Sequence, residues 1–277
     1  MDDRLAAAAR RISPAERRVA EVVAAQRELV AFGTVAEVAE QAGASGASVV
    51  RLADRLGYRG FRGLQAAVRD ELSSRLRPAT EKIRRPVPVD LLDGVGRDAA
   101  AAVGQTFSTL DRTAWERAVR LLSTRRHRVF VLSGDAGAGV GRQVLTHLSM
   151  LRDGVTGLDG STVAVGRQLA AAAEGDVLLC IDLPRHDRSV LDTVAAARRR
   201  GLVVIAVTDS PLSPLATDGA VLLSVGAHDV GPFDSYVAAL AVAETLVAGA
   251  AIRLRGAAVE HLDSIADLWE ETGAIDV

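Results

Sequence analysis

The spacing of apolar residues changes along the chain. As far as residue 123, Val, Leu and Ala recur mostly at intervals of three and four residues, as on the buried face of an amphipathic helix. From residue 128 onwards, short apolar runs alternate with further helical patterns. This order predicts an all-α N-terminal region followed by an α/β domain.

Two helix starts are recognisable near the N-terminus. Residues 13–16, Ser-Pro-Ala-Glu, form a capping box with a proline in the first turn, and the apolar pattern of the helix they open continues over residues 19–30. Residues 34–37, Thr-Val-Ala-Glu, form a second box. The helix that follows is short, because Gly43 stands in the C′ position where a left-handed residue is needed.

A third helix is predicted over residues 46–56, with Ser45 as its N-cap. Its inward face consists of Val49, Leu52, Ala53 and Leu56, whereas Ser48, Arg51, Asp54 and Arg55 are expected elsewhere on its surface. Two short helices joined by a tight glycine turn form the helix-turn-helix pattern. In that motif the N-terminal part of the second helix faces base edges in the major groove, where Arg51 can reach a guanine or a phosphate.

A fourth helix is expected to bury Tyr58, Phe61 and Leu64 and to leave Arg59 and Arg62 free to meet phosphates. The predicted DNA-binding residues are Ser45, Gly46, Ala47, Ser48, Arg51, Arg55, Arg59 and Arg62. Spacing alone also fits a small helical bundle used for protein contacts, so this pattern leaves two interpretations open.

The segments SPAERRVA, AEVAEQAGAS, SVVRLADRLGY and GFRGLQ resemble the N-terminal domain of the RpiR family of bacterial transcription regulators. The resemblance extends over nearly the whole of this region. It implies a winged-type helix-turn-helix bundle whose recognition helix is residues 46–56. It therefore favours DNA binding over a bundle for protein contacts.

Charge and composition divide the chain in the same way. Residues 1–85 hold 16 basic and 11 acidic residues, a formal charge of +5, which leaves −7 for the rest and favours a polyanionic partner for the N-terminal part. The segment 75–90 contains three prolines and five basic side chains without apolar periodicity, as in a linker. We place the first domain at residues 1–76, the linker at 77–90 and the second domain at 91–277.

The second domain begins with helices at about 91–110 and 114–123. Strands are then predicted at 128–133, 154–158, 177–181, 202–207 and 220–225, with helices at 139–151, 161–173, 187–200 and 232–252. This alternation predicts a parallel sheet with helices on both faces. Ligands of such sheets bind beyond the carboxyl ends of the strands, where loops enter helix N-termini.

The segments VFVLSGDAGAG, GDVLLCID, ARRRGLVVIAVTDSPLSPLA and FDSYVAALAVAETLVAGAA resemble the SIS (sugar isomerase) domain. In the RpiR family this domain follows the DNA-binding part. The resemblance implies a flavodoxin-type sandwich, without a bound nucleotide, that dimerises and senses a small molecule.

The predicted effector site departs from the family pattern. Members hold phosphate with a Ser-x-Ser-Gly-x-Thr loop after a central strand and with a serine in the first glycine loop. By register the hydroxyl positions here are Asp182, Pro184 and Asp187, the glycine is Arg185, and the first-loop serine is Ala138. Carboxylates repel a phosphate dianion, whereas guanidinium groups bind phosphate or carboxylate.

The candidate effector-binding residues are Ser133, Asp135, Ala138, Asp182, Arg185, His186, Arg188, Ser189 and Ser210. Three alternatives are open: an effector pocket of changed specificity, a vestigial pocket that serves only dimerisation, and an intact sugar-phosphate site.

Other chemistries have weak support. Glycines in residues 133–139, with Asp159 further on, form a lone motif that is insufficient for a nicotinamide cofactor. The histidines lack ligand spacing, so we predict no metal and no cofactor. Cys180, the sole cysteine, excludes an internal disulfide and is expected to be an inert core residue. Glu244 is expected to be buried, either as an isomerase base or as the partner of an arginine at a dimer seam.

These patterns predict a transcription regulator, not an enzyme, that binds a palindromic double-stranded DNA operator as a homodimer or homotetramer. No signal-peptide pattern opens the chain, and Glu244 interrupts the apolar segment 236–252, so we expect a cytoplasmic protein without a membrane partner. The rivals are a sugar-phosphate isomerase with an extra helical domain and a DNA-binding protein without an effector. An isomerase has no use for a helix-turn-helix, which favours the regulator.

Overall fold

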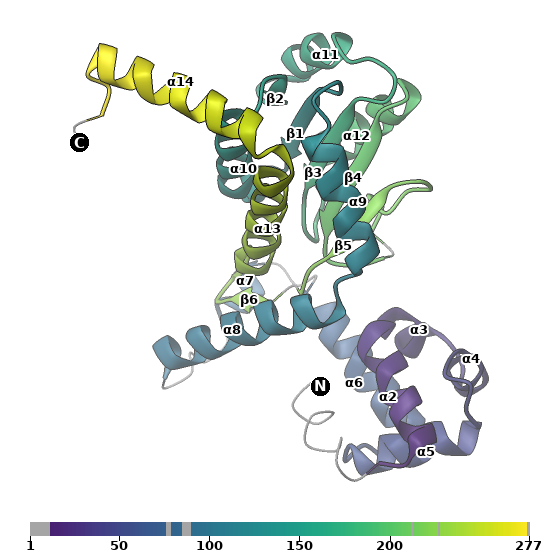
Figure 1. Ribbon diagram of the computed structural model, residues 1–277. Helices are drawn as coiled ribbons and strands as arrows, with labels where there is room; N and C mark the ends of the chain where they lie inside the picture. Colours follow the sequence, from purple (N-terminus) through teal and green to yellow (C-terminus); the bar gives the residue numbers. More distant parts are fainter. Residues whose placement is uncertain (1–11, 76–78, 85–89, 212, 227, 276–277) are drawn as a thin grey trace. The chain divides into compact units, whose positions relative to one another are not determined.

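The computed structural model describes residues 12–75, 79–84, 90–211, 213–226 and 228–275. Its internal contacts divide the chain into two compact units, Met1–Pro78 and Ala79–Val277 (Figure 1). The described part of the first unit is helical and the second is an α/β unit, so the predicted fold class is confirmed.

The first unit contains five described helices. They are α2 (Pro14–Ala25), α3 (Arg27–Phe32), α4 (Val35–Gln41), α5 (Gly46–Arg55) and α6 (Gly60–Arg75). Their fully buried side chains, among them Val23, Val38, Leu52 and Leu64, form one core. The described residues 12–75 contain no β-strand, so the winged form that the resemblance implied is not found there.

Two details of this unit differ from the sequence prediction. The helical pattern over residues 14–30 is broken at Gln26, whose φ of −128° and ψ of 61° are not helical, and this break separates α2 from α3. Tyr58 precedes α6 instead of belonging to it, although it packs against the same core as Phe61 and Leu64. The capping boxes at Ser13 and Thr34 are both present as predicted.

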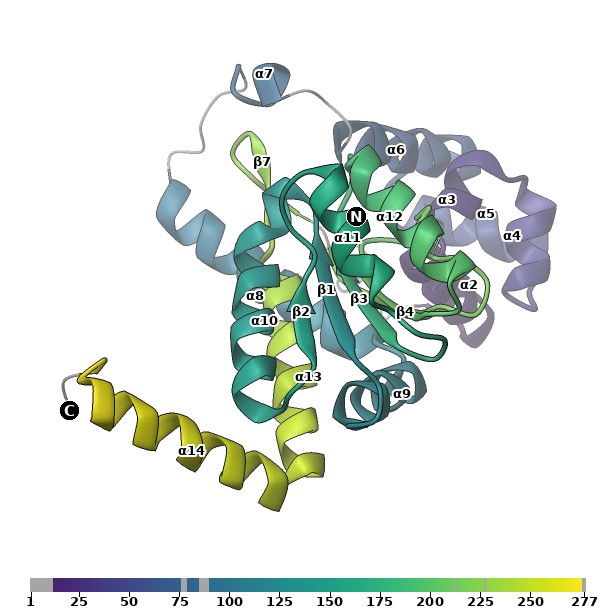
Figure 2. The same cartoon turned by 90° about the horizontal axis from the view of Figure 1, so that it is seen from above.

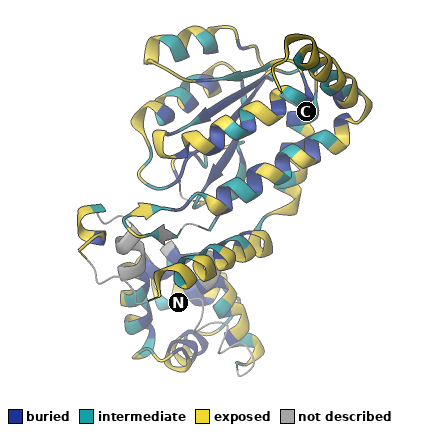
Figure 3. Cartoon of the chain, turned by 90° about the vertical axis from the view of Figure 1, so that its left-hand side faces the viewer, coloured by how far each residue is buried: buried dark blue, intermediate teal, exposed yellow. Residues whose placement is uncertain are grey.

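The second unit is built on a parallel sheet of order β2-β1-β3-β4-β5. The strands are β1 (Val129–Ser133), β2 (Val155–Gly157), β3 (Val177–Ile181), β4 (Val203–Thr208) and β5 (Val221–Ser224). All residues of β3 are buried, which explains why its sequence is continuously apolar. Figure 3 shows the sheet as the buried centre of the unit.

Helices cover both faces of this sheet (Figure 2). They are α8 (Leu91–Thr109), α9 (Arg112–Ser123), α10 (Ala138–Leu151), α11 (Thr162–Ala170), α12 (Arg188–Arg199) and α13 (Val237–Leu254). The last helix, α14 (Gly256–Thr272), packs on α10 and α13 instead of on the sheet. Val129 and Val131 of β1 join a core with α9, α10 and α13. Phe130 and Leu132, which alternate with them, join a second core with α11 and α12.

Four elements were not predicted. The short strands β6 (Asp229–Val230) and β7 (Phe233–Asp234) pair as a hairpin, so α13 begins at Val237 and not near residue 232. Helix α14 follows α13 after Arg255, which has a positive φ of 34°. Helix α7 (Ala79–Lys82) lies in the segment predicted as a linker, and the side chain of Lys82 is buried.

Helix α13 is a core helix of the second unit. It packs against α8, α9 and α10, and its residues Ala239, Val242 and Leu246 are fully buried. By length and composition alone it is apolar enough to cross a membrane, so Glu244 does not shorten the apolar stretch as the sequence argument assumed. Glu244 is exposed, because it lies on the side of α13 away from this core.

Candidate functional site

The helix-turn-helix consists of α4, a tight turn and α5. Helix α4 ends at the C-cap Ala42, and Gly43 follows with a φ of +53°, the left-handed conformation that the sequence predicted. The Ser45 side chain then accepts a hydrogen bond from the backbone N–H of Ser48 and caps α5. The turn therefore fixes the direction in which α5 leaves the bundle.

One face of α5 packs on the core and the other is open to solvent. The buried face is Val49, Leu52 and Ala53, with Leu56 directly after the helix, as predicted. The exposed positions on and just before α5 are Ser45, Ala47, Val50, Arg51, Asp54 and Arg55. Small and basic side chains on the outer face of the second helix are what DNA contact in the major groove requires.

Ser48 lies elsewhere than expected. Its side chain is 3% exposed, its Oγ is 3.0 Å from Ser45 Oγ, and it accepts a hydrogen bond of 2.9 Å from Arg51 Nη2. The prediction that Ser48 lies on the open surface of α5 is wrong. It contacts Arg51 from beneath instead.

Glu16 of α2 reaches the same arginines. Its Oε1 is 3.6 Å from Arg51 Nε and 3.3 Å from Arg55 Nε, and its Oε2 accepts the N-cap hydrogen bond of Ser13 N–H. The pKa of this buried carboxyl is lowered, chiefly by the hydrogen bond from the Ser13 backbone and less by Arg55 and Arg51. Sequence reasoning assigned Glu16 only a capping role.

Arg59 and Arg62 are exposed around the start of α6. Arg59 precedes that helix, and Arg62 stands in its first turn. The backbone N–H of Gly60, between them, donates a hydrogen bond of 2.9 Å to Asp54 Oδ1 at the end of α5. This bond ties the start of α6 to α5.

In the second unit, the loops after β3 and β4 meet at the carboxyl ends of the strands. Asp182, directly after β3, is buried, and its Oδ2 is 3.1 Å from His186 Nδ1. His186 Nε2 is 3.0 Å from Ser213 Oγ. Ser213 Oγ also accepts hydrogen bonds from Thr208 Oγ1 and the Leu215 backbone N–H. Since Ser213 accepts twice, its own hydrogen is directed at His186, which then donates from Nδ1 to Asp182.

This sequence of contacts has the same order as the catalytic triad of a serine hydrolase. A nucleophilic serine needs an accessible oxygen, whereas Ser213 is 8% exposed and its oxygen already accepts the two hydrogen bonds from Thr208 and Leu215. The network therefore holds the loop after β3 against the loop after β4.

Arg185 and Asp187 are both engaged within the protein. Arg185, at a positive φ of 68°, donates from Nη2 to Asp234 Oδ2 at 2.6 Å. The other oxygen of Asp234 is 3.3 Å from Nζ of the buried Lys82. Asp187 is the N-cap of α12 and accepts hydrogen bonds from the N–H and the hydroxyl of Ser189. Asp187 therefore caps the helix end at which the resemblance to the SIS domain implied a phosphate.

Arg188 lies apart from Asp182, Arg185 and His186 of the loop after β3. Its side chain is 91% exposed and lies 3.7 Å from Asp192 along the surface of α12. Ser189 is exposed and bonded to Asp187. We therefore leave both residues out of the proposed site.

The first glycine loop lies against Asp182. A Cβ built on Gly134 would be 2.4 Å from Asp182 Oδ1, which shows how closely this carboxylate meets the loop backbone. Ser133 is half-buried, and its Oγ would be 2.5 Å from a Cβ on Gly141. Asp135 and Ala138 are exposed, and Ser210 is half-buried. Burial, followed by the negative charge of Asp182, raises the pKa of Tyr236 to about 12.

Comparison with known proteins matches a family model to each unit. The family model described as the helix-turn-helix domain of the rpiR family matches residues 1–75, and the SIS domain model matches residues 121–249. The chain belongs to the RpiR family of transcription regulators.

Relatives of this RpiR-family chain are also regulators. The HTH-type transcriptional regulator HexR of Escherichia coli (strain K12) is 24% identical over 89% of this chain and 86% of its own length. YbbH of Bacillus subtilis (strain 168), an HTH-type transcriptional regulator, is 26% identical over 72% of this chain and 70% of its own length.

Two solved structures share the fold. The sugar isomerase domain of an RpiR transcription factor from Sphaerobacter thermophilus is 28% identical, with a TM-score of 0.58, and covers 64% of this chain and 99% of that one. The Vibrio vulnificus NanR protein complexed with ManNAc-6P is 20% identical, with a TM-score of 0.58, and covers 97% of each chain.

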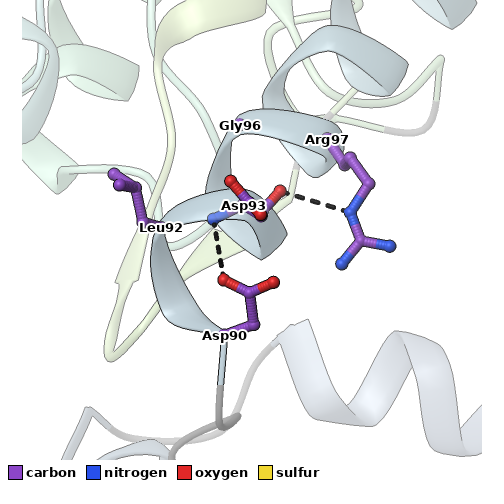
Figure 4. A pocket seen from close by; sticks show the side chains of 5 residues that line it. All are labelled: Asp90, Leu92, Asp93, Gly96 and Arg97. Carbon is purple, nitrogen blue, oxygen red and sulfur yellow. Dashed lines mark hydrogen bonds between the residues drawn. The ribbon is translucent and has the colours of Figure 1, made fainter.

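A hollow on α8 of this RpiR-family protein was considered as a second binding site. The hollow lies on the first turns of the helix and is lined by Asp90, Leu92, Asp93, Gly96 and Arg97. Figure 4 shows that its polar groups bond to one another: Asp90 accepts from Asp93 N–H, and Arg97 donates to the Asp93 carbonyl. Because these contacts lie within successive turns of one helix, the hollow is a surface feature of α8.

Three further predictions concerned a metal site, the thiol of Cys180 and the carboxylate of Glu244. No group of three His, Cys, Asp or Glu residues suited to a metal occurs in the part of the chain that the structure describes. Cys180 is buried, and burial raises the pKa of its thiol, so it stays protonated. Glu244 is exposed and accepts a hydrogen bond of 3.3 Å from Gln143 Nε2, so the prediction of a buried carboxylate is wrong.

Proposed function

We propose that this RpiR-family regulator reads DNA with the exposed face of α5. The proposed contacts are Ser45, Gly46, Ala47, Arg51 and Arg55, with Arg59 and Arg62 meeting phosphates. The observation that carries the proposal is the combination of small residues and two exposed arginines on the second helix of a helix-turn-helix. Ser48 supports Arg51 from the buried side.

Replacing Arg51 with Ala tests this proposal. Specific binding should weaken by roughly 1–3 kcal/mol if Arg51 reads a base. Mobility-shift titration of a duplex enriched from a random library by the wild-type chain measures the change. Arg188→Ala, an exposed arginine of the second unit, is the matched control and should leave binding unchanged. Equal affinity of Arg51→Ala and wild type would remove Arg51 from the reading surface.

We further propose that the second unit pairs two copies of the chain, as a homodimer or as the building block of a homotetramer. Several large apolar side chains of its helices are exposed: Leu91, Leu92, Phe107, Val237, Ile252, Val259 and Leu268. These exposed apolar side chains of α8, α13 and α14 are the candidates for such an interface. Two-fold pairing would place two α5 helices on a palindromic operator, with half-sites about one helical turn or a multiple of it apart.

The loops at the carboxyl ends of β1, β3 and β4 are the proposed effector site. Ser133 ends β1, and Asp182, Arg185, His186 and Ser210 come from the loops after β3 and β4. The NanR protein, whose fold this chain shares, was solved with the sugar phosphate ManNAc-6P. This likeness supports a small sugar-derived effector for the present chain.

Phosphate is the group that this site accommodates least well. Asp182 is buried against Gly134, and Asp187 caps α12, so a phosphate dianion would meet two carboxylates. Arg185 is already paired with Asp234. We propose that the effector is a sugar derivative without a phosphate group, whose hydroxyls donate to Asp182 or whose carboxylate competes with Asp234 for Arg185.

A thermal-shift comparison of neutral sugars, sugar acids and hexose phosphates tests this specificity. A neutral sugar or sugar acid should raise the melting temperature of the wild-type chain, and a hexose phosphate should not. Asp182→Ser places a hydroxyl where the family pattern has one. The rise in melting temperature caused by a hexose phosphate, measured against the same chain without ligand, should be larger for this variant than for the wild type. Stabilisation of the wild type by an ordinary hexose phosphate would contradict the proposal.

The helix-turn-helix and the exposed Glu244 support a regulator without isomerase activity. Such a regulator would work in the cytoplasm, where it meets chromosomal DNA. A base for sugar isomerisation must face a substrate, whereas Glu244 faces solvent and bonds to Gln143. Turnover of a sugar phosphate by the purified chain would favour the enzyme alternative.

A further inference from the structure

Glu16 is a buried carboxylate that joins two functions of the first unit. It occupies the N3 position of α2, where its side chain completes the capping box with Ser13. It is also 1% exposed, and Oε1 lies 3.3 Å from Arg55 Nε and 3.6 Å from Arg51 Nε. A residue of α2 therefore contacts both arginines of the helix that we propose to read DNA.

A capping box does not by itself require these contacts. Glu37 occupies the same N3 position on α4 and makes the same reciprocal bonds with Thr34. It is exposed, and in the described part of the chain its carboxylate bonds to Thr34. The comparison separates the two roles of Glu16: the cap, which Glu37 shares, and the ion pairs with arginines, which belong to Glu16.

The contacts restrain the arginines without covering them. Arg51 is held at two points, by Glu16 at Nε and by Ser48 Oγ at Nη2. The side chains of Arg51 and Arg55 are still 56% and 49% exposed. An arginine loses considerable rotamer freedom when it is fixed in a complex, and less when the free protein already holds it. Restraint combined with exposure is the arrangement that favours recognition of base edges.

We infer that Glu16 is a positioning residue of the DNA-reading surface, whose buried carboxylate fixes Arg51 and Arg55 in the orientation that α5 presents to DNA. The inference rests on the proposed DNA contacts of these two arginines. An opposite role is also chemically conceivable, in which Glu16 neutralises the arginines and weakens DNA binding. The two roles predict changes of opposite sign when the charge is removed.

Glu16→Gln in the full-length chain separates the cap from the charge. Glutamine at N3 also completes a capping box, so α2 keeps its N-cap, but the ion pairs are lost. The matched control is Glu37→Gln, which removes the equivalent carboxylate from α4. The probes are a duplex enriched from a random library by the wild-type chain and a scrambled duplex of the same length and composition.

Glu16→Gln should bind the enriched duplex about 3- to 10-fold more weakly than wild type, since two rotamer-rich side chains must then be ordered on binding. It should bind the scrambled duplex no more weakly, because the chain has lost a negative charge. Glu37→Gln should match the wild type on the enriched duplex. Unchanged or tighter binding of the enriched duplex by Glu16→Gln would overturn the inference, as would equal weakening on both duplexes.

A double-mutant cycle distinguishes positioning from a general folding defect. In a chain that carries Arg51→Ala and Arg55→Ala, adding Glu16→Gln should have no further effect on the enriched duplex. A folding defect would weaken binding in both backgrounds and contradict the inference. If the wild-type chain enriches no sequence at all, the DNA-reading role of α5 fails instead, so the two failures are distinguishable.

Discussion

At the scale of single residues, Arg152 shows how one buried cation stabilises the second unit. It is the C-cap of α10, and its guanidinium donates to five carbonyl groups, those of Leu122, Thr124, Arg125, His127 and Asp153. Burial lowers the pKa of this side chain. Four of these carbonyls belong to the end of α9 and the segment before β1, so Arg152 joins them to α10.

Arg152→Ala should lower the free energy of unfolding by roughly 2–4 kcal/mol, because several buried carbonyl groups lose their donor. Urea denaturation followed by circular dichroism measures the loss. Arg188→Ala, which removes a side chain that is 91% exposed, should change stability by less than about 0.5 kcal/mol. Equal effects of the two substitutions would show that the carbonyl contacts of Arg152 contribute nothing.

Residue roles were predictable where they depend on neighbours in sequence. The capping boxes at Ser13 and Thr34 and the left-handed Gly43 need only a few adjacent residues. The contacts of Glu16 with Arg51 and Arg55 join positions far apart in sequence, so no local pattern contains them. The exposure of Glu244 was missed because α13 is apolar around most of its circumference. The sequence pattern therefore does not show which side of the helix faces solvent.

At the scale of elements, the close packing of α13 on α9 depends on Gly249. A Cβ at this position would lie 2.8 Å from Val119 Cγ2 and 3.2 Å from Trp115 Cζ2. Val119 is buried and stiff at χ1, so it cannot move aside easily. The two helices therefore approach closely at this glycine.

Gly249→Val should lower the free energy of unfolding by about 1–3 kcal/mol, as overpacking of a filled core usually does. Gly166→Ala in α11 is the control, because a Cβ there meets nothing within 4 Å. It should raise stability by up to about 1 kcal/mol through helix propensity. Thermal unfolding of both variants measures the difference. The packing account is wrong if both substitutions stabilise the chain.

Strands and helices were predictable to different degrees. The strand predicted at residues 177–181 coincides with β3, since a central parallel strand is apolar throughout. The break at Gln26 carries no proline or glycine to mark it. The hairpin of β6 and β7 has strands of two residues, too short for any periodicity, so the helix was predicted to begin near residue 232.

At the scale of the whole molecule, the RpiR-family chain combines the helix proposed to read DNA with a domain whose charged loops are largely paired internally. Asp182 bonds to His186, Arg185 to Asp234, and Asp187 caps α12. An effector that binds at the proposed site must compete with these bonds, so its binding is expected to rearrange the loops. The phosphate-site departures were visible in the sequence, but the partners of each charge were not, because Asp234 and Lys82 lie far from residue 185 in the chain.

The central claim is that two copies of the chain read a specific DNA sequence through α5. The most direct measurement is selection of duplexes from a random library by the full-length wild-type chain, followed by titration of the enriched duplex and a scrambled one at physiological salt. We predict a palindromic sequence with half-sites about 10 base pairs or a multiple of that apart, bound at least about a thousandfold more tightly than the scrambled duplex. Equal affinity for both duplexes, or no enriched sequence, would contradict the claim.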